Sequence, residues 1–144
     1  MSTRMPKGCY VFLVEDEVMI RMMVADMLQE LGYRVAGEAG RVEEALGLVQ
    51  RTEFDIAIMD INLHGEPVFP VAKAIKERNR PFIFATGYSA STLPDEFRDR
   101  PALQKPFQIE TLGKLLEGTL KATRYRWAPR AFRATLRKPA GVTL

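Results

Sequence analysis

The sequence predicts an α/β domain: a doubly wound, five-stranded parallel sheet of flavodoxin-like (βα)5 type, with strand order 2-1-3-4-5. Five short apolar runs alternate with stretches in which apolar residues recur every three or four positions. The first, third and fourth runs are almost continuously apolar, as is typical of strands that have helices on both faces of the sheet. The chain has 144 residues, which is the length of one domain with one core.

The elements follow one another from residue 9 onward. The first strand is "CYVFLV", and Gly32 ends the helix after it, whose apolar positions are Ile20, Met23, Val24, Met27, Leu28 and Leu31. The other strands read "RVAGEA", "DIAIMD", "FIFAT" and "ALQKP", so the five are expected at residues 9–14, 34–39, 55–60, 82–86 and 102–106. Helices are expected at residues 17–31, 41–51, 67–78 and 108–122, with a weaker candidate near 89–98.

Charge divides the chain into a mildly acidic domain and a basic tail. Residues 1–117 hold all 18 acids against 14 Lys and Arg, whereas residues 118–144 hold seven Lys and Arg and no acid. We expect a lead at residues 1–8, a domain at 9–122 and a basic extension at 123–144 that is irregular or partly disordered, because it loses the alternation and contains Pro129 and Pro139.

Composition favours a cytoplasmic protein that does not span a membrane. Apolar residues make up 47% and charged residues 27%, and no apolar run approaches the roughly 20 residues that a membrane helix needs. The N-terminus has no segment of signal-peptide type, and a single cysteine, Cys9, cannot form an intrachain disulfide. Cys9 opens an apolar run, so we expect it to be a small buried thiol.

Carboxylates stand at the ends of two expected strands. Glu15 and Asp16 follow the first strand, and Asp60 ends the third. In a sheet of this type, ligands bind outside the carboxyl ends of the strands where the strand order reverses, so these three acids are expected in one pocket. Clustered carboxylates repel one another unless a cation neutralises them, and an all-oxygen set suits Mg²⁺.

Two further strand ends carry groups that phosphoryl transfer would need. Thr86 closes the fourth strand with a hydroxyl, and Lys105 closes the fifth with an ammonium that can pair with a phosphoryl oxygen. In the resulting hypothesis Asp60 attacks phosphorus, Mg²⁺ and Lys105 neutralise the developing charge, and Thr86 hydrogen-bonds the transferred group.

In the order of its motifs, the sequence resembles the receiver domain of two-component response regulators. "FLVEDE", "IMDINLHG", "FATGYS" and "LQKPF" match that family's successive motifs over residues 9–122. The resemblance implies that Asp60 is the phospho-acceptor, Asp16 a direct Mg²⁺ ligand, and Glu15 an acidic neighbour acting through water. It also implies the backbone carbonyl of Asn62 as a ligand, Thr86 as the switch hydroxyl and Lys105 as the phosphate-binding lysine.

The resemblance further implies a signalling protein rather than an ordinary enzyme. A histidine kinase or a phosphotransfer protein would donate the phosphoryl group to Asp60, and the receiver would catalyse both that transfer and the later hydrolysis. We expect a single-domain regulator, a monomer or weak dimer, that signals through a phosphorylation-dependent protein contact or acts as a phosphate sink.

One position departs from the family pattern. Many receivers carry Tyr or Phe three residues before the strand-5 lysine, where this chain has Ala102. The run from Phe84 to Tyr88 instead resembles a subfamily with a Phe-Ala-Thr-Gly signature, whose members pair with histidine kinases of the HWE type. Our hypothesis is that Gly87 loosens this loop and that Tyr88 takes over part of the work of the missing ring.

Several other residues are expected to lie outside the chemistry. His64 is interpreted as a solvated loop residue beside the site, Asp55 as the polar start of the third strand, and Glu17 as part of the first turn of its helix. Met19 and Met22 lie off the apolar stripe of that helix, where they suit an adaptable partner surface or are simply exposed.

Three competing functions remain open at this stage. A Mg²⁺-dependent phosphatase of the haloacid dehalogenase type would also use an aspartyl nucleophile, but that class wants an acid where this chain has Asn62. The second competing function is that of a receiver-like binding module that is never phosphorylated. The third is nucleic-acid or acidic-partner binding by the tail, in which Trp127 and Phe132 stand among arginines; the tail could instead fold back on the domain. It is too short for an ordinary DNA-binding output domain, so sequence-specific DNA binding is not expected.

Overall fold

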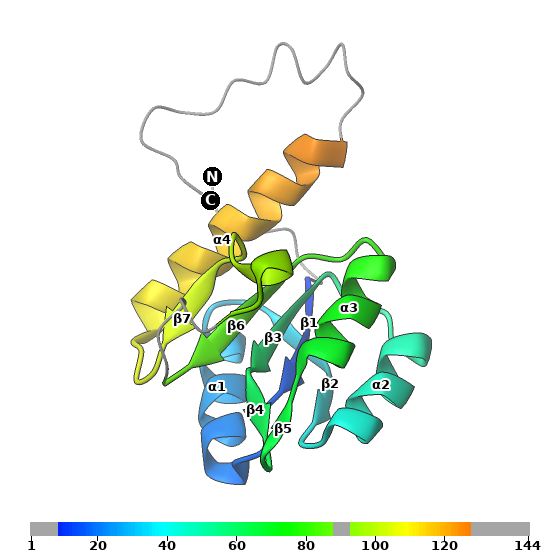
Figure 1. Ribbon diagram of the computed structural model, residues 1–144. Coiled ribbons are helices and arrows are strands. Elements are labelled where there is room, and N and C mark those ends of the chain that lie inside the picture. The colour runs from blue at the N-terminus through cyan, green and yellow to red at the C-terminus, as the bar shows by residue number, and fades with distance from the viewer. Residues whose placement is uncertain (1–8, 88–92, 128–144) are drawn as a thin grey trace, which may run out of the picture.

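The computed structural model describes residues 9–87 and 93–127, with side chains up to Thr123 (Figure 1). Its strands are β1 (Tyr10–Val14), β2 (Arg34–Ala39), β3 (Ile56–Asp60), β4 (Asn62–Leu63), β5 (Glu66–Pro67), β6 (Phe82–Thr86) and β7 (Ala102–Gln104). Its helices are α1 (Val18–Glu30), α2 (Val42–Arg51), α3 (Phe69–Glu77) and α4 (Ile109–Trp127), with a 3-10 turn at Asp95–Phe97. The expected lead at residues 1–8, Tyr88 and the tail from residue 128, Phe132 included, lie outside the described residues.

Five strands form one parallel sheet, which confirms the predicted fold class. Their order is β2-β1-β3-β6-β7, and each neighbouring pair is parallel. Counted within the sheet alone this is the order 2-1-3-4-5. The labels differ because the short antiparallel pair β4-β5, which we did not predict, takes two of them. Strand order reverses between β1 and β3, and the register places Val14 opposite Met59, so the two strands end side by side.

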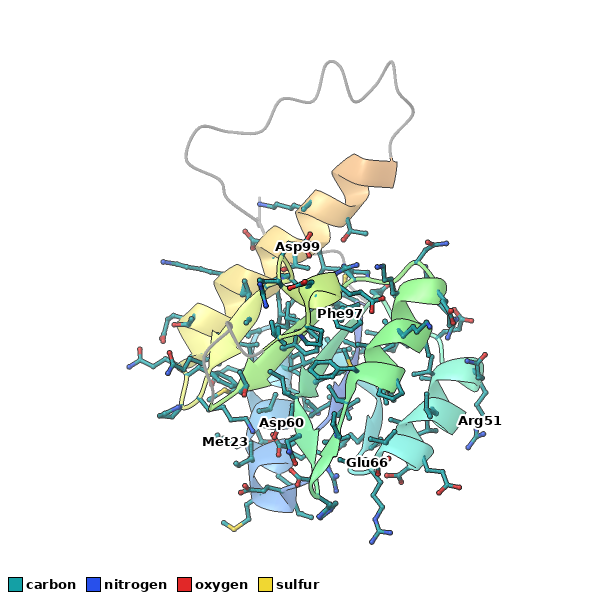
Figure 2. All side chains as sticks on the ribbon, in the orientation of Figure 1. Met23, Arg51, Asp60, Glu66, Phe97 and Asp99 are labelled. Atoms are coloured by element: carbon teal, nitrogen blue, oxygen red, sulfur yellow. The ribbon has the colours of Figure 1, made fainter. Side chains whose placement is uncertain are left out.

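Helices cover both faces of the sheet, as the continuous apolar strands require (Figure 1). Inward-pointing residues of β1 alternate between two clusters: Phe12 and Val14 pack with α2 and α3, whereas Val11 and Leu13 pack with α1 and α4. The first cluster contains a ring group in which Phe97 contacts Phe69, Phe82 and Phe84 at centroid distances of 5.7 to 5.9 Å (Figure 2). This packing fixes the sheet from both sides and leaves its carboxyl edge to the loops.

The hairpin β4-β5 directly follows Asp60. Its two-residue turn consists of His64 and Gly65, with φ values of 52° and 83°. Positive φ at both central positions matches the right-handed twist of a two-residue hairpin, and glycine adopts it without steric cost. We expected a loop here, because the two-residue strands are too short to show an alternating pattern.

Two expected elements were wrong in their extent. Of the weaker helix expected near 89–98, residues 89–92 lie outside the described residues, and in the described part Pro94 precedes a 3-10 turn of only three residues instead of an α-helix, since proline lacks an N–H and disfavours helix in the residue before it. Conversely, α4 continues through Trp127, so the basic extension does not become irregular at residue 123. No glycine or proline interrupts residues 119–127, and the first helix-stopping residue is Pro129.

Helix α1 buries a narrower stripe than its periodicity suggested. Val24 and Leu28 are buried, whereas Met23, which we placed on the apolar stripe, is 47% exposed (Figure 2). Met19 and Met22 are exposed, and Cys9 is buried, as predicted. Among the described residues, no helix is both long and apolar enough to cross a membrane.

Candidate functional site: an acidic cluster with a lysine at the carboxyl edge of the sheet

The three predicted acids meet at the carboxyl ends of β1 and β3. Glu15 and Asp16 follow the last residue of β1, and Asp60 is the last residue of β3 (Figure 2). One carboxylate oxygen from each of the three lies within 4.8 Å of the other two. The parallel pairing of β1 with β3 produces this cluster, because it brings residues 45 positions apart to the same edge.

Lys105 reaches into this cluster from the end of β7. Its Nζ donates to Oε1 of Glu15 at 2.6 Å and to Oδ2 of Asp60 at 3.0 Å. Its backbone N–H donates to the carbonyl of Thr86 at 2.8 Å, which ties the end of β7 to the end of β6. Thr86 itself is 1% exposed. All five predicted polar side chains at the strand ends are therefore found at one edge of the sheet.

Burial and pairing oppose each other at Glu15 and Lys105. Burial is the largest influence on Glu15 and raises the pKa of its carboxyl above the ordinary value, although the Lys105 ammonium acts against it. Burial also disfavours the ammonium of Lys105, but its hydrogen bonds to Glu15 and Asp60 outweigh that effect and raise its pKa. A charged lysine therefore occupies the space between the two carboxylates.

Asp16 is held by the hairpin turn. Oδ2 of Asp16 accepts the backbone N–H of His64 at 2.9 Å. Burial favours the neutral acid here, but hydrogen bonds, that of the His64 amide foremost, outweigh it and lower the pKa of Asp16. The imidazole of His64 is 59% exposed and its Nδ1 lies 3.8 Å from the same oxygen, so the prediction of a solvated residue beside the site is confirmed. The role of its backbone amide gave no sequence signal.

The backbone of Asn62 faces Asp60. Val68 donates its backbone N–H to the carbonyl of Ile61, so the next pair of the hairpin, Asn62 with Pro67, is a non-hydrogen-bonded pair. In such a pair both the N–H and the C=O point away from the partner strand. The N–H of Asn62 points to Oδ1 of Asp60 at 3.4 Å.

Arg21 and Gly40, which the sequence did not single out, help to position the backbone of Glu15. Arg21 of α1 donates from Nη1 to the backbone carbonyl of Glu15 at 2.8 Å, and its Nε lies 3.4 Å from Glu38. A side chain at Gly40 would come within 2.7 Å of that guanidinium, so the glycine leaves room for it. Glu17, expected in the first turn of its helix, occupies the N-cap position just before α1 and makes no capping hydrogen bond with its side chain. Its N–H donates to Oε2 of Glu15 at 3.1 Å, whereas its carboxylate is not part of the cluster.

The donor set fits a hard divalent cation. Glu15, Asp16 and Asp60 offer carboxylate oxygens, and the cluster contains no sulfur or nitrogen ligand. Mg²⁺ prefers such oxygens and keeps several waters, which suits a cluster that is open on the side of the exposed hairpin. Asp55 lies at the opposite end of β3, where its Oδ2 accepts the N–H of Tyr10, and takes no part.

The comparisons with known proteins agree with this fold. The sequence profile of the response regulator receiver domain matches residues 11–117, and the chain belongs to that family. The solution structure of SdrG from Sphingomonas melonis Fr1 is 42% identical with a TM-score of 0.71, over 81% of this chain and 99% of that chain. The BeF3-activated conformation of SdrG, from Pseudomonas melonis Fr1, is 42% identical with a TM-score of 0.66, over 74% and 92% of the two chains.

A curated relative extends beyond the matched region. The transcriptional regulatory protein PdtaR of Mycobacterium tuberculosis is 37% identical over 120 residues, which is 81% of this chain and 58% of that protein. The chain thus spans less than two thirds of the length of this relative. Receiver homologues are signalling proteins rather than ordinary enzymes, so the phosphatase hypothesis loses its support.

Proposed function

We propose that this chain is a response regulator that accepts a phosphoryl group on Asp60, in a Mg²⁺-dependent reaction, from a histidine kinase or a phosphotransfer protein. One observation carries the proposal: an ammonium lies 3.0 Å from Asp60, within a cluster of three carboxylates. Carboxylates brought this close raise one another's free energy, so the arrangement needs cations: Lys105 compensates two of the acids, and Mg²⁺ would compensate the cluster further. The family to which the chain belongs supports the same function.

Asp60 is the nucleophile of the proposed reaction. One of its carboxylate oxygens forms a bond to phosphorus while the phosphorus–nitrogen bond of the donor histidine breaks, and the electron pair returns to the imidazole nitrogen. Mg²⁺, when bound, would supply the positive charge that offsets charge developing on the transferred phosphoryl group. Asp16 and Asp60 would hold it directly and Glu15 through water. The backbone carbonyl of Asn62, whose N–H points to Oδ1 of Asp60, would complete the protein ligands.

Lys105 changes partners in this proposal. Its ammonium pairs with Glu15 and Asp60 before transfer. Once Asp60 is phosphorylated to an acyl phosphate, its carboxyl group loses its full charge and a phosphoryl oxygen becomes the stronger acceptor, so Lys105 moves to it. The same ammonium would stabilise charge on the phosphoryl group during transfer and during the later hydrolysis by water.

In this proposal, Thr86 couples phosphorylation of Asp60 to a structural change at the surface. Its backbone is hydrogen-bonded to that of Lys105 at 2.8 Å, so a shift of either residue displaces the other strand end. A hydroxyl drawn toward the phosphoryl oxygens would leave a space beside β6. Ala102 is opposite Phe84 in the register, so no ring at that position can fill the space, and Tyr88 is our candidate to do so.

The proposed output is a phosphorylation-dependent protein contact or the draining of phosphoryl groups from a kinase, in the cytoplasm and as a monomer or weak dimer. SdrG, for which a BeF3-activated conformation is known, supports a receiver that changes conformation on activation. A donor kinase of the HWE type follows from the Phe-Ala-Thr-Gly run alone. The alternative is a receiver-like module that only binds.

Acetyl phosphate tests the proposal without a kinase. We expect the intact mass of the wild-type chain to increase by one phosphoryl group in Mg²⁺, and to stay unchanged in EDTA. Asp60→Asn should stay unmodified in both, while Asp55→Asn, at the other end of β3, should behave as wild type. An unmodified wild-type chain that nevertheless binds Mg²⁺ would favour the binding module, and a modified Asp60→Asn would place the acceptor elsewhere.

A further inference from the structure

The short connection between β1 and α1 carries two acids of the site. Glu15 and Asp16 lie in this connection, which runs from the end of β1 at Val14 to the start of α1 at Val18. Asp60, by contrast, is the last residue of a strand and is paired in the sheet. The strand ladders therefore hold Asp60, whereas the position of Asp16 depends on contacts of the connection itself.

One guanidinium holds the peptide unit that joins Glu15 to Asp16. Nη1 of Arg21, in the first turn of α1, donates to the carbonyl oxygen of Glu15 at 2.8 Å. Because a peptide unit is planar, a bond that fixes this oxygen also fixes the direction in which the chain enters Asp16. The Arg21 side chain is only 20% exposed, and its Nε lies 3.4 Å from Oε1 of Glu38 in β2. The guanidinium thus has a defined place between α1, β2 and the acids.

Gly40 leaves the space that this guanidinium occupies. A Cβ at residue 40 would lie 2.7 Å from Nη1 of Arg21, which is too close for either atom to stay where it is. The same Cβ would lie 3.5 Å from the Glu15 carbonyl oxygen and 3.7 Å from Cα of Asp16, which are ordinary contacts. An alanine at this position would therefore displace the flexible end of Arg21 and leave the backbone of the two acids in place.

We propose that Arg21 is a positioning residue of the metal site, which sets the affinity for Mg²⁺ by holding Asp16 through the carbonyl of Glu15. This role rests on the proposed function, in which Asp16 binds the ion directly. Its sign is opposite to that of a charge effect. A guanidinium repels a cation, so its removal would strengthen Mg²⁺ binding if only charge mattered. Removal weakens Mg²⁺ binding if the guanidinium orients a ligand.

Calorimetric titration of the full chain with Mg²⁺ tests this role. Arg21→Met keeps an apolar stem without the guanidinium and should weaken Mg²⁺ binding about tenfold, as is usual when a group that orients a metal ligand is lost. Arg78→Met is the matched control. The Arg78 side chain is 24% exposed and also donates to backbone carbonyls, those of Val49 and Thr52, but these precede the start of β3. Arg78→Met should lower stability to urea and leave the Mg²⁺ affinity unchanged.

Gly40→Ala tests the position of the guanidinium while Arg21 stays in the chain. This variant should weaken Mg²⁺ binding to a similar degree, and it carries the test where Arg21→Met is too unstable to titrate. Combined with Arg21→Met it should cause no further loss, because both substitutions act through one contact. Gly47→Ala, in α2, controls for the replacement of a glycine and should not change the Mg²⁺ affinity.

The outcomes separate this role from the proposed function. Mg²⁺ binding by Arg21→Met that equals or exceeds that of wild type would overturn the role of Arg21 and leave the proposed function standing. Losses from Arg21→Met and Gly40→Ala that add in the double variant would overturn it as well. A wild-type chain that binds no Mg²⁺ would refute the proposed metal site, and the role of Arg21 with it.

Discussion

The ammonium of Lys105 lies 3.0 Å from the carboxylate of Asp60, 45 positions earlier in the chain, and 2.6 Å from that of Glu15. One cation therefore compensates two acids, one on each of two neighbouring strands. The pKa of Lys105 is raised, because both hydrogen bonds favour its charged form over the burial that opposes it. In the metal-free protein, the Lys105 ammonium therefore supplies the positive charge that offsets the carboxylates of Glu15 and Asp60.

Removing that cation should destabilise the metal-free protein and improve metal binding. In EDTA, we expect Lys105→Met to lower the free energy of unfolding by about 1–3 kcal/mol, since two largely buried carboxylates lose their partner. Mg²⁺ should stabilise this variant more than it stabilises wild type, because the ion no longer competes with an ammonium. Urea denaturation with and without Mg²⁺ measures both effects. Lys114→Met, at an exposed position of α4, is the matched control and should change neither quantity; equal effects of the two substitutions would refute the assignment.

The raised pKa of Glu15 makes stability depend on pH. Because burial disfavours its carboxylate, its contribution to stability is fully present below the ordinary pKa of 4.5 and is lost as pH rises through the raised native pKa. Glu15→Gln removes this titration. In EDTA, the stability of Glu15→Gln relative to wild type should therefore increase from pH 4 to pH 7. Glu77→Gln, exposed on α3, controls for the loss of a surface charge, and a Glu15→Gln difference that stays flat with pH would contradict the cause given.

The hairpin turn should matter for metal binding as well as for stability. Gly65 has a φ of 83° and donates its N–H to Oδ1 of Asn62 at 2.8 Å. Gly65→Ala should cost about 1–2 kcal/mol, because an L side chain is strained in that conformation, and should weaken Mg²⁺ binding by disturbing Asn62. Gly47→Ala inside α2 has the opposite sign: it meets nothing nearer than 3.7 Å and should stabilise by about 0.5–1 kcal/mol. Calorimetry measures the unfolding and the Mg²⁺ binding of both variants. Unaltered Mg²⁺ affinity in Gly65→Ala would show that the hairpin turn does not influence the metal site.

Thr86 should be needed for the response and dispensable for the chemistry. Thr86→Val preserves the volume of a residue that is 1% exposed but removes its hydroxyl. We expect this variant to accept a phosphoryl group from acetyl phosphate, yet to show few of the amide shifts that BeF3 produces in wild type. Thr86→Ser keeps the hydroxyl and should retain those shifts. If Thr86→Val responds like wild type, the hydroxyl is not the switch.

The sheet and the meeting of the site residues could be predicted because both depend on strand ends. Runs such as "FIFAT" are apolar throughout, and parallel pairing brings Asp16, Asp60, Thr86 and Lys105 to one edge wherever the intervening helices fall. Their co-location was confirmed. Their roles in phosphoryl transfer stay predictions, since they depend on a ligand and on a reaction rather than on position.

The features that escaped prediction depend on contacts without a local pattern. The hairpin after Asp60 has strands of only two residues, so "NLHGEP" shows no alternation, although a glycine in a two-residue turn was a usable signal. Arg21 reaches the Glu15 carbonyl only because Gly40 leaves the space open, a relationship between three separate elements. Pro94 was a signal against an α-helix over the described residues 93–98, and the continuation of α4 to Trp127 followed from the absence of any glycine or proline between Gly118 and Pro129.

The most direct test of the account is the position of the phosphoryl group. The chain, treated with acetyl phosphate and Mg²⁺, is reduced with borohydride, which converts an aspartyl phosphate to homoserine, and then digested with trypsin. We predict homoserine at residue 60 in the peptide that runs from Thr52 to Lys73, and none at Asp55 of the same peptide or at Asp16. Homoserine at either of those positions, with residue 60 still aspartate, would contradict the assignment of Asp60 as the acceptor.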